Sequence, residues 1–135
     1  MNIENFNKKA LYIMIREMTG SNTQHITRVV NQMKRYYVNM MEEFSLRRKL
    51  IVDGLRSLKG VECNLPGGSF FVFPKVKGTG MDGEEFTEKC LQEAGVAMIP
   101  GTAFGKFASD HVRFNFATSR ENISKAIEKI DKILK

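Results

Sequence analysis

One long helical pattern constrains the fold of this chain more than any other feature. From residue 24 to residue 58, apolar residues recur mostly three and four positions apart, the spacing that places them on one face of an α-helix. The preceding residues 21–24 have the form of a capping box, and Gly60 marks the end of the pattern. Such a helix is a rod of roughly 50 Å. A domain of 135 residues is too small to cover it, so part of this helix should contact something outside the domain.

The segment ahead of this pattern, residues 1–20, forms a second amphipathic stripe. Its apolar positions recur at helical spacing between residues 3 and 18, and Thr19 with Gly20 interrupts the stripe. The apolar positions are Ile3, Phe6, Ala10, Leu11, Met14 and Met18. We therefore expect an amphipathic leader helix within residues 1–20.

After Gly60 the pattern changes to short strands separated by helices. In chain order we expect strands at 61–64 and 69–73, a helix at 82–94, strands at 96–99 and 111–117, and a helix at 119–134. Asp82 with Glu85, and Thr118 with Glu121, have the spacing of helix caps. Gly95 is placed to end the first of these helices. The predicted fold class is α/β (α+β), a long N-terminal helix plus a small mixed sheet of three to four strands with helices packed on it.

The composition indicates a compact protein and argues against a nucleic-acid partner. Apolar residues make up 42% of the chain, which is enough for one hydrophobic core. The net charge is +6, but the basic residues are spread along the chain and mixed with acids, apart from residues 47–49. No aromatic residues are interleaved with a basic stripe, so we expect no nucleic-acid partner.

Cysteine, histidine and the N-terminal residues give no sign of a metal site, a disulfide or a membrane anchor. Cys63 and Cys90 are too few and too far apart for a disulfide framework, and His25 and His111 stand in no ligand spacing with them. We expect two free thiols in a reducing cytoplasm and no bound metal. No apolar run approaches the ~20 residues of a membrane span, and residues 1–20 lack the pattern of a signal peptide. A cytoplasmic location follows from these observations.

An arginine among aromatic residues marks the strand expected at 111–117. Val112, Phe114 and Phe116 alternate with Arg113, so the strand has one apolar face and one face with another role. The planar guanidinium of an arginine binds a carboxylate through two parallel hydrogen bonds and stays charged at any working pH. The alternative is that Arg113 forms an ion pair with a local acid such as Asp110.

Several motifs in this order resemble those of a known family. They are "RRKLIVDGL" at 47–55, "PGGSFF" at 66–71, "GVAMIPGTAFG" at 95–105, "VRFNFAT" at 112–118 and "ENISKAIEKI" at 121–130. Together they resemble the C-terminal small domain of the fold-type I, pyridoxal-phosphate-dependent aminotransferases of class I/II, and most of all the aspartate aminotransferase branch. The resemblance covers about residues 22–135, and residues 1–20 show none. It implies a small domain at 21–135, made of the long helix 24–58 and an α/β unit at 60–135.

The resemblance implies roles for individual residues of a substrate-binding site. Arg113 corresponds to the arginine that binds the α-carboxylate of the substrate. Phe70 corresponds to an aromatic residue that lines the substrate pocket, and Gly68 to a position where the backbone approaches the ligand. The loop 101–105 shapes the path into the arginine strand. From the residues alone, Phe70 could equally be a core residue and Gly68 a turn residue.

The resemblance also implies a cofactor, pyridoxal phosphate, that this chain is not expected to bind alone. The family holds the cofactor with a Schiff-base lysine, an acid and an anion site in a large domain. Lys8 and Lys9 lack the sequence context of that lysine, so we expect no catalytic and no cofactor-binding residue here.

Two functions remain open at this point. The first is a truncated or excised aminotransferase small domain that supplies Arg113 and is not catalytically competent alone. Its partners would be an amino acid or 2-oxo acid, together with a missing large domain or further copies of the chain in a homo-oligomer. The second is a stand-alone, non-catalytic module that binds a carboxylate or another protein. The sequence does not name the amino acid substrate.

Overall fold

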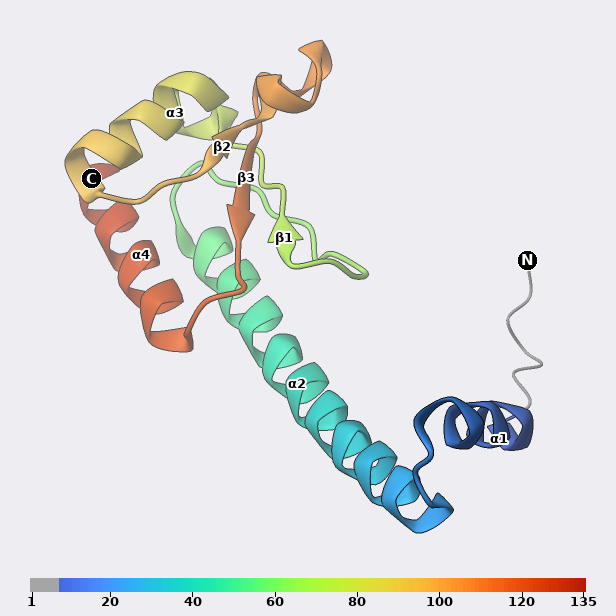
Figure 1. The fold of residues 1–135 in the computed structure, drawn as a ribbon. Helices are drawn as coiled ribbons and strands as arrows, with labels where there is room; N and C mark the ends of the chain where they lie inside the picture. The colour runs from blue at the N-terminus through green and yellow to red at the C-terminus, as the bar shows by residue number, and fades with distance from the viewer. Residues whose placement is uncertain (1–7) are drawn as a thin grey trace. The chain divides into compact units, whose positions relative to one another are not determined.

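The computed structural model describes residues 8–135 (Figure 1), and the chain divides into two compact units. The first unit is Met1–Glu42 and the second is Glu43–Lys135. The division falls inside helix α2, Thr23–Ser57, which is continuous over this whole range. The long helix expected at 24–58 is therefore confirmed.

The first unit contains helix α1, Lys8–Thr19, and the N-terminal part of α2. Helix α1 lies within the helix expected at residues 3–18, and residues 1–7 lie outside the described part of the chain. Between the helices, the side chain of Asn22 accepts a hydrogen bond of 2.8 Å from the backbone N–H of His25. Asn22 therefore caps α2. The capping box expected to start at Ser21 is wrong by one residue, because the helix begins at Thr23 and its cap is Asn22.

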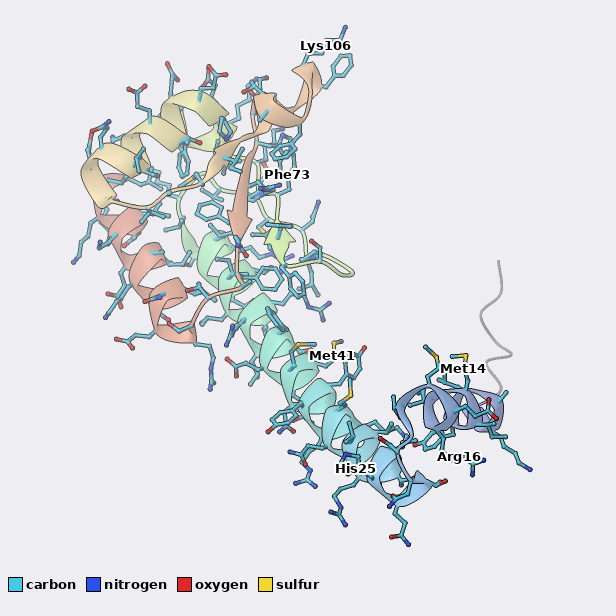
Figure 2. The ribbon with its side chains drawn as sticks, viewed as in Figure 1. Met14, Arg16, His25, Met41, Phe73 and Lys106 are labelled. Atoms are coloured by element: carbon cyan, nitrogen blue, oxygen red, sulfur yellow. The ribbon has the colours of Figure 1, made fainter. Side chains whose placement is uncertain are left out.

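Most apolar side chains on the first unit's part of α2 are exposed. Ile26 is buried, but the following residues of the apolar stripe are not. The exposed ones are Val29, Met33, Tyr36, Tyr37, Val38, Met40 and Met41, of which Figure 2 labels Met41. The expectation that part of the long helix lacks cover within its own domain agrees with these exposures.

The sheet of the second unit has three strands in the order β1–β3–β2. Strand β1 is Phe71–Val72, β2 is Ile99–Pro100 and β3 is Val112–Asn115. Figure 1 shows β3 between the other two. Both pairings are antiparallel, so the expected mixed sheet is corrected to an antiparallel one. Along the chain, helix α3 (Gly83–Lys89) connects β1 to β2, as in a unit of two adjacent parallel strands. In the sheet, however, β3 lies between β1 and β2 and is antiparallel to both.

The strand expected at 61–64 is reduced to a single bridge. Glu62 pairs with Lys75, which in turn pairs with His111. The number of strands, three, lies within the expected range, and the fold class of a small sheet with helices around it is confirmed.

Two further helices of the second unit flank the sheet residues. Helix α3, Gly83–Lys89, continues as a π-helical turn over Cys90–Ala94, and α4 is Arg120–Ile133. The predicted capping box of Asp82 and Glu85 is present, and Gly95 has the predicted left-handed conformation at φ 64°. At α4 the predicted cap is wrong by one residue. Ser119, not Thr118, accepts the hydrogen bond from the N–H of Asn122.

One hydrophobic core joins the sheet to α2, α3 and α4. Its members come from α2, β1, α3, β3 and α4 and from the segments between them, and include Leu55 of α2, Phe86 of α3, Phe116 after β3 and Ile123 of α4. Helices α2 and α4 approach so closely that a Cβ at Gly54 would lie 2.9 Å from a side-chain carbon of Ile127. This core supports β3 from one face only, which leaves the other face available for a site.

Candidate functional site

The two faces of β3 separate core residues from the candidate site. Val112 and Phe114 are buried, as is Phe116 just beyond the strand. The register pairs Ile99 with Arg113 and Phe71 with Asn115, and directly paired residues of an antiparallel sheet lie on the same face. Arg113 and Phe71 therefore share the face opposite the core.

The guanidinium of Arg113 contacts two aromatic rings. Its central carbon Cζ is 4.3 Å from the ring centroid of Phe71 and 4.7 Å from that of Phe104. Both distances are typical of cation–π contacts. Within residues 8–135, Arg113 makes no side-chain hydrogen bond and no ion pair. Its five N–H donors are therefore free to bind an anion.

The alternative role of Arg113, an ion pair with Asp110, is wrong. Asp110 instead binds Lys77, with Nζ and Oδ2 3.1 Å apart. Asp110 precedes β3, and its carboxylate accepts a hydrogen bond from Lys77, the first residue of a short 3₁₀ turn at residues 77–79. This carboxylate therefore does not pair with Arg113.

The loop that carries Phe104 is held by contacts at its beginning and end. The N–H of Gly101 donates to the carbonyl of His111 at 2.7 Å. A side chain at Gly101 would collide with the carbonyl oxygen of Ala108, so this close approach requires glycine. The hydroxyl of Thr102 donates to the carboxylate of Glu84 on α3 at 2.8 Å. These contacts set where the Phe104 ring lies.

The structure describes no ring contact of Phe70, and no interaction of Gly68, with Arg113. The Phe70 ring packs on Phe44, with the centroids 4.6 Å apart, and is 48% exposed. The ring beside Arg113 is that of the next residue, Phe71. A Cβ at Gly68 would have no neighbour within 4 Å, and the left-handed residue of this turn is Ser69 at φ 79°. Their proposed roles toward a ligand stay predictions.

An aromatic hollow adjoins the arginine through Phe104. It has a volume of about 260 Å³ and is lined by Phe73, Phe104, Gly105, Phe107, Ala108 and His111. The Phe73 ring stacks on His111 at 5.2 Å between centroids and meets Phe104 edge-on at 5.9 Å. Figure 2 labels Phe73 in this region and Lys106 in the adjoining loop. Sequence reasoning missed Phe71, Phe73 and His111, although period-two alternation along each strand was a usable signal.

Glu43, Cys63 and Cys90, which lie outside this face, have pKa values shifted from their usual range. Hydrogen bonding from Arg47, at 2.8 Å, lowers the pKa of Glu43, and Arg120 lies 3.4 Å from the same carboxylate. Burial raises the pKa of the Cys63 thiol, and it raises the pKa of Cys90 to about 11. Both thiols are therefore protonated near neutral pH.

No helix within the described residues is long and apolar enough to cross a membrane. In the same part of the chain, no three His, Cys, Asp or Glu side chains are grouped so that they could hold a metal ion.

The residues around Arg113 do not fit pyridoxal phosphate. The rings of Phe71 and Phe104 are the contacts of Arg113, and neither a lysine nor an acid joins them in the described ion pairs and hydrogen bonds. The site therefore offers a cation for a carboxylate, but not the lysine and the acid that would hold the ring of the cofactor.

Comparison with known proteins places this chain in a family. The family model described as aminotransferase class I and II matches residues 9–130, so the similarity begins ahead of the motifs, inside the segment 1–20. An aspartate aminotransferase of Pyrococcus horikoshii is 36% identical over 125 residues, which are 93% of this chain and 30% of that protein. The chain thus spans less than a third of the length of this relative.

Solved structures agree with the sequence match. An aromatic aminotransferase from Pyrococcus horikoshii matches with a TM-score of 0.70 at 36% identity, over 74% of this chain and 26% of that one. Aspartate aminotransferase from Thermus thermophilus, solved with maleate, matches with a TM-score of 0.66 at 38% identity, over 76% of this chain and 26% of that one. Since the family model covers most of the sequence and the folds agree, this chain belongs to the class I and II aminotransferase family.

Proposed function

We propose that this chain acts as an aminotransferase small domain that binds the α-carboxylate of an amino acid or 2-oxo acid through Arg113. The observation that carries the proposal is the state of Arg113, an arginine on the outer face of β3 that has two ring contacts and no anionic partner within residues 8–135. An arginine held in this way and left unpaired is suited to a carboxylate supplied by a ligand.

Amino-group transfer would require groups beyond those described. The family implies pyridoxal phosphate, and the residues around Arg113 do not fit that cofactor. The proposed contribution of this chain is therefore binding and orientation of the substrate carboxylate, with the reacting groups on another domain. We expect that the chain alone, given pyridoxal phosphate, shows neither amino-group transfer nor a lysine adduct that borohydride traps at one residue.

A second candidate function is a stand-alone module that binds a carboxylate without catalysis. The misfit between the described residues and the cofactor favours it. The two candidates share the role of Arg113. They separate on whether a large aminotransferase domain, added as a second protein, forms a complex with this chain and gains amino-group transfer.

The test of the carboxylate site is a titration of the isotope-labelled chain with maleate, followed by NMR. We expect weak binding, in the millimolar range, because the site is exposed and hydrogen bonds to water compete with those to the ligand. Signals of Arg113 and Phe71 should shift, and Arg113→Gln should weaken binding at least about tenfold, since a charge-assisted hydrogen bond is lost. The matched control is Arg120→Gln, which removes an arginine from the ion pair with Glu43. Shifts that occur elsewhere and survive Arg113→Gln would overturn the proposal.

We also infer association of the chain into a homo-oligomer or with a large domain, and a cytoplasmic location. The exposed apolar residues of α2 in the first unit support association, because patches of this kind usually have a partner. Light scattering over a wide concentration range tests the homo-oligomer, and a monomer throughout would contradict it.

A further inference from the structure

We propose that Phe104 is a positioning residue that, with Phe71, clamps the guanidinium of Arg113 for carboxylate binding. This inference rests on the proposed function, because it names how the same site is held in shape. The clamp consists of the two rings whose centroids lie 4.3 Å and 4.7 Å from Cζ of Arg113. One ring comes from β1 and the other from the loop after β2.

Ring contacts hold an arginine without using its hydrogen-bonding capacity. A cation–π contact is made through the face of the ring, whereas the N–H groups of the guanidinium lie in its plane. An ion pair with an acid of the same chain would hold Arg113 as well, but it would occupy the donors. The clamp thus fixes the side chain and leaves the donors available, which suits a planar, two-oxygen anion.

Phe104 can hold Arg113 because its own ring is held. The Phe73 ring meets it edge-on at 5.9 Å, and Phe73 in turn stacks on His111. The loop backbone is anchored by the hydrogen bond from Gly101 to His111, and its Thr102 side chain is anchored to Glu84. Phe104 is half exposed, at 50%, so its ring contributes more to this row of aromatic contacts than to the buried core.

The clamp lowers the entropic cost of binding. A free arginine side chain has many rotamers, and a ligand must restrict them when it binds. With the rings in place this restriction exists before the ligand arrives. Removing the Phe104 ring should therefore weaken carboxylate binding by about two- to fivefold, the range expected for one cation–π contact at an exposed site.

The test compares Phe104→Leu with Phe107→Leu. Phe107 is the matched control because it lies in the same loop and contacts a cation, Lys106, at 5.1 Å, but it is 90% exposed and makes no described contact with Arg113. The first measurement is the Nε–Hε NMR signal of Arg113 in the ligand-free chain, which neighbouring rings shift. The second is the dissociation constant for maleate. Phe104→Tyr keeps the ring and serves as the rescue variant.

We expect Phe104→Leu to move the Arg113 Nε–Hε signal toward that of a free arginine and to raise the maleate dissociation constant two- to fivefold. Phe107→Leu and Phe104→Tyr should leave both near the values of the unmodified chain. An unchanged Nε–Hε signal in Phe104→Leu overturns the clamp, and so does an unchanged affinity. If the unmodified chain binds no maleate at Arg113, the proposed function fails, and the Nε–Hε signal still decides separately whether the rings hold the arginine.

Discussion

The two faces of strand β3 carry side chains of different kinds in different surroundings. On the inner face, Val112 and Phe114 are buried in the core together with Phe116. On the outer face, Arg113 contacts two rings and is only partly buried. The backbone between them is the same, because successive side chains of a strand point to opposite faces. A strand can therefore be anchored by one set of residues while the other set remains open to a ligand.

This difference separates stability from binding along one strand. The inner residues contribute by removing apolar surface from water, and their contacts come from α2, α3 and α4. The outer arginine contributes little to folding because its donors have no partner within the described chain. Substitutions on the inner face should therefore lower mainly the free energy of unfolding, and substitutions on the outer face should lower mainly the affinity for a ligand.

The largest effect on stability is expected on the inner face. Phe116 is 1% exposed, and Phe116→Ala would leave a cavity in the core. We expect a loss of about 3–5 kcal/mol in the free energy of unfolding, measured by urea denaturation. Phe116→Leu is the milder comparison, because it keeps most of the volume. A loss under about 1 kcal/mol for the alanine variant would show that the inner face is not packed as described.

A pH-dependent effect is expected from the buried Cys90. Burial raises the pKa of this thiol from 9.0 to about 11. As the pH rises from 9 to 11, the unfolded chain loses this proton before the folded chain does, so the stability that the buried thiol contributes is present below pH 9 and is lost toward pH 11.

The measurement is urea denaturation of the unmodified chain and of Cys90→Ala at several pH values. The difference in stability between them should shrink from pH 8 to pH 11, because alanine does not titrate. A difference that stays constant with pH would contradict a raised pKa for Cys90.

A smaller effect on stability is expected on the outer face. Arg113→Gln removes two cation–π contacts at a partly exposed position, so the free energy of unfolding should fall by no more than about 2 kcal/mol. Together with the loss of maleate binding, this would show that the outer face serves a ligand. A loss as large as that of Phe116→Ala would instead indicate that Arg113 is mainly structural.

The smallest effect is expected on the exposed part of α2. Met33 is 65% exposed, and Met33→Ala should change the free energy of unfolding by no more than about 0.5 kcal/mol at low protein concentration. If the chain associates through this surface, the effect should grow with protein concentration, since association stabilises the folded state. Denaturation at two concentrations a hundredfold apart measures the difference.

Local features of the sequence were sufficient for the helices and for part of the candidate site. The capping box of Asp82 and Glu85, the left-handed Gly95 and the continuous helix α2 depend on residues within a few positions of one another. The face of β3 that carries Arg113 also follows from alternation alone. The cap of α4 was predicted at Thr118 but lies at Ser119. Such an error of one residue arises because either of two adjacent hydroxyl side chains can accept the capping hydrogen bond.

The tertiary structure alone decided which ring stands beside the arginine and in which direction the strands run. Phe70 and Phe71 are adjacent, and only the pairing of Phe71 with Asn115 places the second of them on the face of Arg113. A shift of one residue in that pairing would exchange the two rings. Likewise, Phe104 reaches Arg113 through the loop anchored at Gly101, and β3 enters between β1 and β2 to make every pairing antiparallel. The helices and the alternation follow from short-range sterics and spacing, whereas register and loop placement depend on contacts between residues far apart in the chain.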